Sequence, residues 1–226
     1  MKSHLKRLVT PKSWTILKKE EKFVVRPRPG AHPAALSMPI SLLLKTIGYA
    51  STTKEAKKIL NTKEVLVDGK RVKEHKFPVG LMDIISIKDT KDLFRVVFDL
   101  KGRLKIISID KDEAQLKVSR IKGKTILKKG KMQLNLSDNK NILVDKGDYK
   151  VGDSLLITVP FQEIKQHLKF EKGALIYLIG GKHKGHKGTV ESIEGNKLIY
   201  TEAKKKHESL KKYAFVIGKT KEAIKI

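Results

Sequence analysis

The excess of basic over acidic side chains constrains this chain more than any other feature of its sequence. The 226 residues include 50 Lys and Arg against 24 Asp and Glu, which gives a formal net charge of +26. A compact fold with that charge repels itself, and an anionic partner relieves the repulsion. Nucleic acid is the densest such partner, because each bound phosphate releases condensed counterions. The charge therefore indicates a protein that binds nucleic acid.

The basic residues are spread along the chain, and most of them are lysine. Residues 1–36 carry nine Lys or Arg and two Glu, and residues 171–226 carry thirteen Lys and six Glu, so each end has a net charge of +7. Seven of the 50 basic residues are Arg, which leaves 43 Lys. Lysine meets phosphate as a point charge, whereas arginine supplies the planar fork that reads guanine edges. We therefore expect recognition of RNA backbone and shape, by a protein that the RNA surrounds.

Cysteine usage and hydropathy exclude several other classes of protein. Because the chain has no Cys, it has no disulfide, no thiolate zinc site and no cysteine nucleophile. Its 39% hydrophobic residues suffice for packed cores, but the apolar runs are short, as at 40–44, and none can span a membrane. The first residues are not followed by the apolar segment of a signal peptide. We therefore expect a cytoplasmic protein.

Two short helices are predicted between residues 39 and 61. Apolar residues recur at helical spacing from Ile40 to Ile47, after Pro39, which is favourable at a helix start, and before Gly48, which ends the pattern. Thr52 or Thr53 then caps a second helix over residues 54–60. The exposed face of this second helix is expected to carry lysines.

The rest of the chain reads as β structure. Alternating apolar residues and Gly, Asp and Asn turn signals predict a series of short antiparallel strands. They are expected at 64–72 around an Asp68-Gly69 turn, and at 81–87, 94–100, 104–109, 116–127, 132–136, 141–144, 154–159, 175–179, 189–193, 197–201 and 213–217. The predicted fold class is α+β, mostly β: a helical domain with a hairpin, a central antiparallel β domain and a small C-terminal barrel.

The first 38 residues are basic and punctuated by proline. Prolines at 11, 27, 29 and 33 prevent helix in the interior of the segment. Trp14 and Phe23 are its large apolar residues. The pattern predicts an extended arm with an aromatic anchor that folds only against RNA, and a disordered terminus is the alternative for the isolated chain.

A loop rich in glycine, lysine and histidine spans residues 180–188. Its glycines let the backbone approach phosphates. It is not a nucleotide-binding P-loop, because His186 stands where that motif requires Lys and a strand follows where it requires a helix. His183 and His186 lack further ligands at metal spacing, so a zinc site is not expected. We instead expect these loop residues to touch RNA or solvent.

Two segments resemble known RNA-binding modules. Residues 39–87 resemble the domain first described in the fourth small-subunit ribosomal protein, through Ala56, Ile59 and Leu60 of the second helix and the hairpin at 65–69. That family often has Ser-Arg where this chain has Thr52-Thr53, so its arginine contact would come from Lys54 or Lys57. The glycine loop and its flanking strands resemble the KOW module of ribosomal proteins and transcription elongation factors.

The pieces in order resemble one family along the whole chain, the archaeal and eukaryotic e-type of small-subunit ribosomal protein four. The resemblance rests on separated motifs: His4–Arg7 with Pro11-Lys12 and Trp14, Arg26-Pro27 to His32, Gly80–Ile87, Phe94-Arg95, Lys101–Arg103, Gly180-Gly181 and Phe215–Lys219. The short end after Lys219 and the heavy use of lysine favour an archaeal member.

The resemblance implies a basic N-terminal arm (1–38), an RNA-binding domain (39–92), a central β domain (93–170) and a KOW-type barrel (171–226). It implies a structural constituent of a 30S-type small ribosomal subunit that binds rRNA beside neighbouring ribosomal proteins. We expect no catalytic residues, no metal or nucleotide cofactor, no membrane contact and no homo-oligomer. RNA contacts are expected from Lys6, Arg7, Trp14, Arg26, Arg28, Lys45, Lys54, Lys57, Lys58, Lys63, Lys70, Arg71, Lys73, Arg103, Gly181, Lys182, His183, Lys184, Gly185, His186 and Lys187.

Two other classes of function stay open from the sequence. The first is an RNA-modifying enzyme or its accessory factor. Pseudouridine synthases with the same RNA-binding domain carry Gly-Arg-Leu-Asp with Asp as the nucleophile, and this chain has Gly102-Arg103-Leu104-Lys105, so the nucleophile is missing. The second is a KOW protein that binds a polymerase. A protein of that class should have localised charge and an apolar docking patch, whereas the basic residues of this chain are spread along its whole length.

Overall fold

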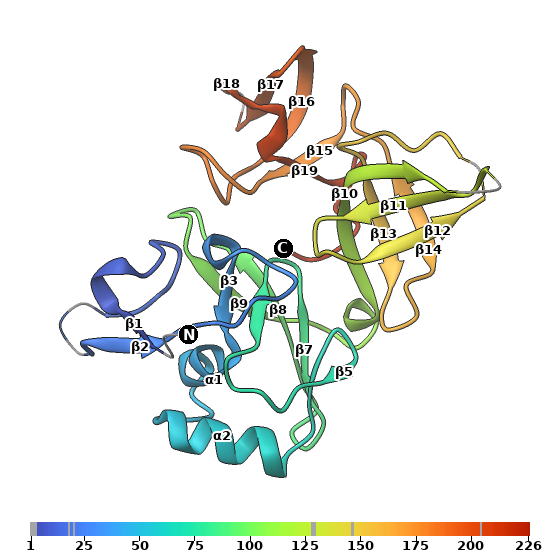
Figure 1. The fold of residues 1–226 in the computed structure, drawn as a ribbon. Helices are drawn as coiled ribbons and strands as arrows, with labels where there is room; N and C mark the ends of the chain where they lie inside the picture. The colour runs from blue at the N-terminus through green and yellow to red at the C-terminus, as the bar shows by residue number, and fades with distance from the viewer. Residues whose placement is uncertain (1–3, 18, 20, 128–129, 146, 204) are drawn as a thin grey trace. The chain divides into compact units, whose positions relative to one another are not determined.

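The computed structural model describes residues 4–17, 19, 21–127, 130–145, 147–203 and 205–226. The chain divides into two compact units. Figure 1 labels helices and strands of the fold. The first comprises Met1–Val97 and Arg103–Ala114, and the second comprises Phe98–Gly102 and Gln115–Ile226. The fold is mostly β with two short helices, which confirms the predicted fold class.

The first unit holds both α-helices and three small sheets. Strands β1 (His4–Lys6) and β2 (Phe23–Val25) form a hairpin, and β3 (Ser37–Pro39) pairs with β6 (Pro78–Gly80). The third sheet has five strands in the order β5-β4-β7-β8-β9. Its strands and the remaining elements are β4 (Val65–Val67), β5 (Lys70–Arg71), β7 (Ile84–Ile87), β8 (Asp92–Phe98), β9 (Leu104–Ser108), α1 (Ile40–Ile47), α2 (Thr53–Thr62), η1 (Arg7–Val9), η2 (Ala34–Leu36) and η3 (Glu113–Gln115).

Local sequence accounts for the ends of the two helices. Pro39 is the N-cap of α1, and Gly48, at φ 92°, ends it in the left-handed conformation that suits glycine. The Thr52 side chain caps α2 by accepting a hydrogen bond from the Glu55 amide, and the Glu55 carboxylate accepts one from the Ser51 amide. This reciprocal pair resembles a capping box. The sequence left the cap as Thr52 or Thr53, and the structure places it at Thr52.

The second unit holds two five-stranded antiparallel sheets. The central sheet has the order β12-β11-β10-β13-β14, and the C-terminal sheet has the order β18-β17-β16-β15-β19. Their elements are β10 (Leu116–Ile126), β11 (Met132–Leu136), β12 (Asn141–Val144), β13 (Ser154–Thr158), β14 (Ile164–Leu168), β15 (Leu175–Leu178), β16 (Lys187–Glu194), β17 (Lys197–Glu202), β18 (Lys205–Leu210), η5 (Lys211–Tyr213) and β19 (Ala214–Gly218).

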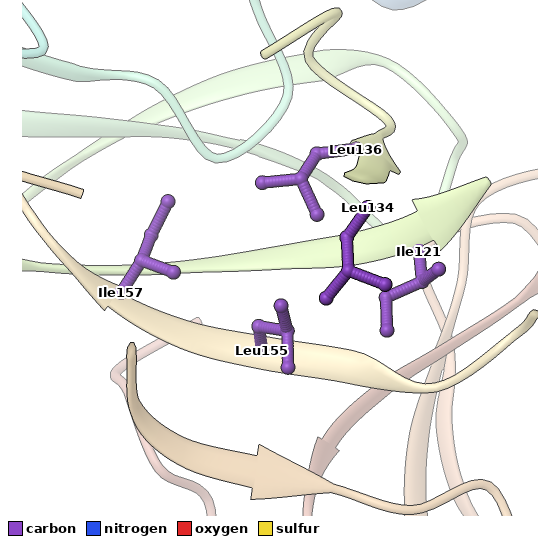
Figure 2. Close-up of a cluster of buried hydrophobic side chains, with 5 residues drawn as sticks. All are labelled: Ile121, Leu134, Leu136, Leu155 and Ile157. Atoms are coloured by element: carbon purple, nitrogen blue, oxygen red, sulfur yellow. The ribbon is translucent and has the colours of Figure 1, made fainter. Parts of the chain in front are cut away.

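One face of the central sheet carries a buried apolar core. Figure 2 shows the five side chains of this core, which come from β10, β11 and β13: Ile121, Leu134, Leu136, Leu155 and Ile157. Each is at most 1% exposed. Alternate residues on antiparallel strands point to the same face, so the period-two apolar pattern of these strands forms one continuous core.

Several predicted elements differ from the structure. The predicted strand at 81–87 begins only at Ile84, because Met82 adopts a φ of 65° and a turn precedes the strand. Strands β14 and β18 were not predicted, since their sequences are largely polar. The predicted boundary after residue 92 falls inside β8, which continues the sheet of the β4–β5 hairpin. The division into four parts, with its boundaries, stays a prediction.

The N-terminal segment is not an extended arm in the structure. Beyond its hairpin, it contributes Trp14, which is 3% exposed and donates its indole N–H to the Ser37 carbonyl at 2.6 Å. The Ser13 hydroxyl donates to the Ala35 carbonyl at 2.9 Å. The segment therefore packs on the protein itself, and the expectation that it folds only against RNA stays a prediction.

Candidate nucleic-acid interface

Helix α2 presents a lysine face opposite its packed face. Ala56 and Leu60 are buried, whereas Lys54, Lys57 and Lys58 are exposed. Residues three and four apart are neighbours on a helix surface, so the three ammonium groups share one side of α2. None of them forms an ion pair with any residue that the structure describes. The cluster is thus a concentrated and unneutralised positive surface.

The neighbouring predicted residues divide into exposed and paired side chains. Lys70, Arg71 and Lys73 are exposed on and after β5, the edge strand of its sheet. Two further lysines of the predicted set contact acids: Lys63 lies 3.9 Å from Asp89, and Lys45 lies 3.2 Å from Glu21. Exposed ion pairs of this kind contribute little to stability, so phosphates can compete for these lysines.

The N-terminal residues of the predicted set have different environments. Lys6 and Arg26 are exposed, and Arg28 pairs with Glu74 at 3.2 Å. Arg7 instead donates to the Thr10 hydroxyl at 2.8 Å and to carbonyls of the loop that follows. Arg7 therefore closes its own loop, and the buried Trp14 anchors the segment to the fold, while an RNA contact of either residue stays a prediction.

The glycine loop makes close contacts with the protein at Lys184 and Gly185. The Gly185 amide already donates to the Leu178 carbonyl at 2.7 Å, and Gly185 is buried against the backbone of Asp99. The Lys184 ammonium lies 3.6 Å from the centre of the Phe98 ring, and burial lowers the pKa of Lys184 to about 8. These contacts lie within the second unit, and they engage Lys184 and Gly185 with the protein itself; the expected RNA contacts of both residues stay a prediction.

The remaining loop residues are partly committed to protein contacts. His186 Nδ1 lies 2.8 Å from a Glu202 oxygen, and the Lys187 ammonium donates to Glu222 and to the Ile226 carbonyl, each at 2.7 Å. The His183 ring lies 4.8 Å from the His207 ring, and burial beside other cationic groups lowers the pKa of His183. Gly181 and Lys182 are exposed, so they are the loop positions open to a ligand.

The segment Gly102-Arg103-Leu104-Lys105, which was compared with pseudouridine synthases, contains no acidic residue. Arg103 and Lys105 are exposed around the start of β9. Asp110 and Asp112 are also exposed and lie in the turn before η3, as expected for a turn or helix start. Within the described part of the chain, no three His, Asp or Glu side chains are grouped so that they could hold a metal ion. No described helix is long and apolar enough to cross a membrane.

A pocket of about 320 Å³ in the first unit brings together residues that sequence reasoning missed. It is lined by His4, Phe23, Val24, Val25, Lys57, His75 and Lys76. Of these residues only Lys57 was in the predicted set. The apolar run at 23–25 was the available signal for strand β2, but nothing local shows that the hairpin meets residues 75 and 76.

Together these features define a class: a modular, mostly β protein whose exposed lysines form a surface for a polyanion. Comparison with known families gives matches along the chain. Family models match as the RS4NT domain at residues 1–35, the S4 domain at 38–85, ribosomal family S4e at 90–164 and the KOW motif at 172–202.

Curated relatives and a solved structure agree with these family models. The small ribosomal subunit protein eS4 of Methanocaldococcus jannaschii is 43% identical over 241 residues, covering 100% of this chain and 98% of its own. That of Aeropyrum pernix is 44% identical over 199 residues, covering 84% of this chain and 79% of its own. The crystal structure of the 30S ribosomal protein S4e from Thermoplasma acidophilum has a TM-score of 0.73 and 30% identity, covering 82% of this chain and 96% of that one. The chain belongs to the ribosomal S4e family, which confirms the resemblance seen in the sequence.

Proposed function

We propose that this protein is a structural constituent of the small ribosomal subunit, where it binds and stabilises small-subunit rRNA and thereby supports translation. Full-length similarity to archaeal eS4 proteins supports this role. Such a constituent works in the cytoplasm beside neighbouring small-subunit proteins, without a catalytic step, a cofactor or a homo-oligomeric state.

The lysine face of α2 is the observation that carries the proposal. Like charges three and four residues apart on a helix destabilise it, and Lys54, Lys57 and Lys58 are arranged in this way. Glu55, the acid between them, is engaged in the capping box. The repulsion is relieved when phosphates lie against the face, because each contact also releases condensed counterions. Exposed Lys70, Arg71 and Lys73 extend the basic surface in the same unit.

The surface is suited to backbone and shape recognition. Lysine offers a point charge with no planar fork, and a side chain cannot easily read the deep groove of an A-form helix. We therefore infer that the lysine face holds the phosphates of rRNA helices. Lys6, Arg26, Arg103 and Lys182, which are exposed, add further phosphate contacts.

The test is a charge reversal with a matched control. The test variant combines Lys54→Glu, Lys57→Glu and Lys58→Glu. The control combines Lys105→Glu, Lys111→Glu and Lys165→Glu, three exposed lysines outside the predicted set, so that both variants lose the same charge. Binding to small-subunit rRNA is measured over a range of salt concentrations.

The slope of log K against log salt should fall in magnitude by about 2 to 3 for the test variant, since each lost phosphate contact removes about 0.7 to 0.9. The control variant should keep most of the native slope of log K against log salt. Equal slopes in both variants, or rRNA binding that the test variant leaves unchanged, would refute the assignment of the α2 face.

A further inference from the structure

The pocket beside the β1–β2 hairpin is built by three separate pieces of the first unit. The hairpin supplies His4, Phe23 and Val25, which lie on one face of the two strands. Helix α2 supplies Lys57, and the turn at 74–77 supplies His75 and Lys76. The Arg28 amide donates to the Lys76 carbonyl at 3.0 Å, which ties the chain after β2 to that turn. The pocket is therefore a product of the fold.

Aromatic surface is available inside the pocket. The His4 and Phe23 rings are 4.7 Å apart in an edge-to-face arrangement, and Phe23 remains 46% exposed. Part of the Phe23 ring is therefore accessible to a ligand from solvent. Val25 and the His75 ring add further walls. The cavity can therefore take a flat ring against its aromatic side.

The polar groups at the pocket are cationic or uncharged. Lys57 and Lys76 bring ammonium groups to the pocket. Burial, and then Lys57 and other nearby cations, lower the pKa of His75, so its ring is neutral at neutral pH and can stack or share a hydrogen bond. The nearby carboxylate, Glu74, pairs with Arg28 at 3.2 Å and lies 2.9 Å from His75. The net charge there favours an anionic ligand.

We propose that this pocket receives a single unstacked nucleotide of the bound RNA, with its base against Phe23 and its phosphate at Lys57 and Lys76. The inference rests on the proposed rRNA-binding function. The pocket volume of about 320 Å³ is near the lower limit for small-molecule sites and suits one nucleotide. Proteins that recognise RNA commonly splay out loop or bulge bases and stack them on aromatic side chains. The lysine face of α2 continues to the pocket through Lys57, so the backbone held by α2 can enter it.

The experiment compares substitutions of two exposed phenylalanines in the full chain. Phe23→Ala and Phe23→Leu remove the aromatic face, and Phe23→Trp keeps one. Phe161→Ala is the control, because Phe161 is 80% exposed and lies outside the pocket. Binding to small-subunit rRNA is measured for each variant, after circular dichroism has shown that it is folded. Quenching of Phe23→Trp fluorescence by the RNA is read above the signal of Trp14, the single native tryptophan.

Stacking predicts that Phe23→Ala and Phe23→Leu weaken binding about five- to a hundredfold. Phe23→Trp should bind like the native chain and lose fluorescence on binding, and Phe161→Ala should have little effect. If Phe23→Leu binds as well as the native chain, the contact is apolar and the nucleotide assignment is wrong. If all variants bind rRNA equally, the pocket is empty in the complex and only the proposed function survives. If the native chain does not bind rRNA, both proposals fail.

Discussion

Tyr177→Phe removes one buried hydroxyl that makes two hydrogen bonds to the same backbone residue. The Tyr177 side chain is fully buried in β15. Its hydroxyl accepts a hydrogen bond from the Phe98 amide at 2.7 Å and donates one to the Phe98 carbonyl at 2.8 Å. Burial raises the pKa of Tyr177, so the hydroxyl stays protonated and can donate. The hydroxyl thereby holds residues 98–102 in the second unit, although they are distant from β15 in sequence.

The size of the effect follows from the groups left behind. Phenylalanine has nearly the same shape, so little packing is lost. The Phe98 amide and carbonyl would both lose their partner in a buried site, and each unsatisfied group costs about 1 to 3 kcal/mol. The free energy of unfolding should therefore fall by about 2 to 6 kcal/mol.

Tyr200→Phe is the matched control in the same sheet. Tyr200 is also fully buried, but its hydroxyl has no hydrogen-bond partner among the described residues. Removing it should leave stability unchanged or slightly raised. Urea unfolding followed by circular dichroism compares the two variants, and equal losses of stability would refute this account of Tyr177.

Three further predictions concern stability. Burial lowers the pKa of Lys184 to about 8, so between about pH 8 and 10.5 the folded state binds fewer protons than the unfolded state. The free energy of unfolding of the native chain should therefore rise with pH across this range. Lys184→Met should reduce that rise in urea titrations, and an unchanged dependence of the free energy on pH would contradict the prediction. Thr52→Ala should lower the free energy of unfolding by about 1 kcal/mol through loss of the α2 cap. Thermal unfolding measures the change, and an unchanged melting temperature would contradict the capping role. Trp14→Phe should lower the free energy of unfolding by about 1 to 3 kcal/mol, because the Ser37 carbonyl loses its donor. The folded variant should keep its rRNA affinity, and a loss of affinity without a loss of stability would identify Trp14 as an RNA contact.

Local patterns were sufficient for most of the fold. The helix ends at Gly48 and Thr52 follow from capping chemistry that acts within a few residues. The Asp68-Gly69 turn follows from the positive φ values that such a hairpin requires, observed as 48° and 73°. Strand β18 was missed because it is an edge strand of lysine, histidine and glutamate, which lacks the apolar alternation of a packed strand.

The site was predicted less completely, because side-chain partners come from distant segments. The lysine face of α2 needed only helical spacing and was placed correctly on the surface. The roles of Lys184 and Gly185 could not be read from the glycine loop, since their contacts come from Phe98 and Asp99, more than eighty residues earlier. The loop-closing hydrogen bonds of Arg7 could not be predicted either, because the sequence shows the charge of this residue and not its partners.

The central claim is that the chain is a resident part of the small ribosomal subunit. Its most direct test is sedimentation of a cell lysate through a sucrose gradient, with the protein followed by mass spectrometry before and after a high-salt wash. The account predicts stoichiometric migration with the small subunit that survives the wash, because many phosphate contacts act together. Migration at the top of the gradient, or loss from the subunit in moderate salt, would contradict it and indicate a transient factor.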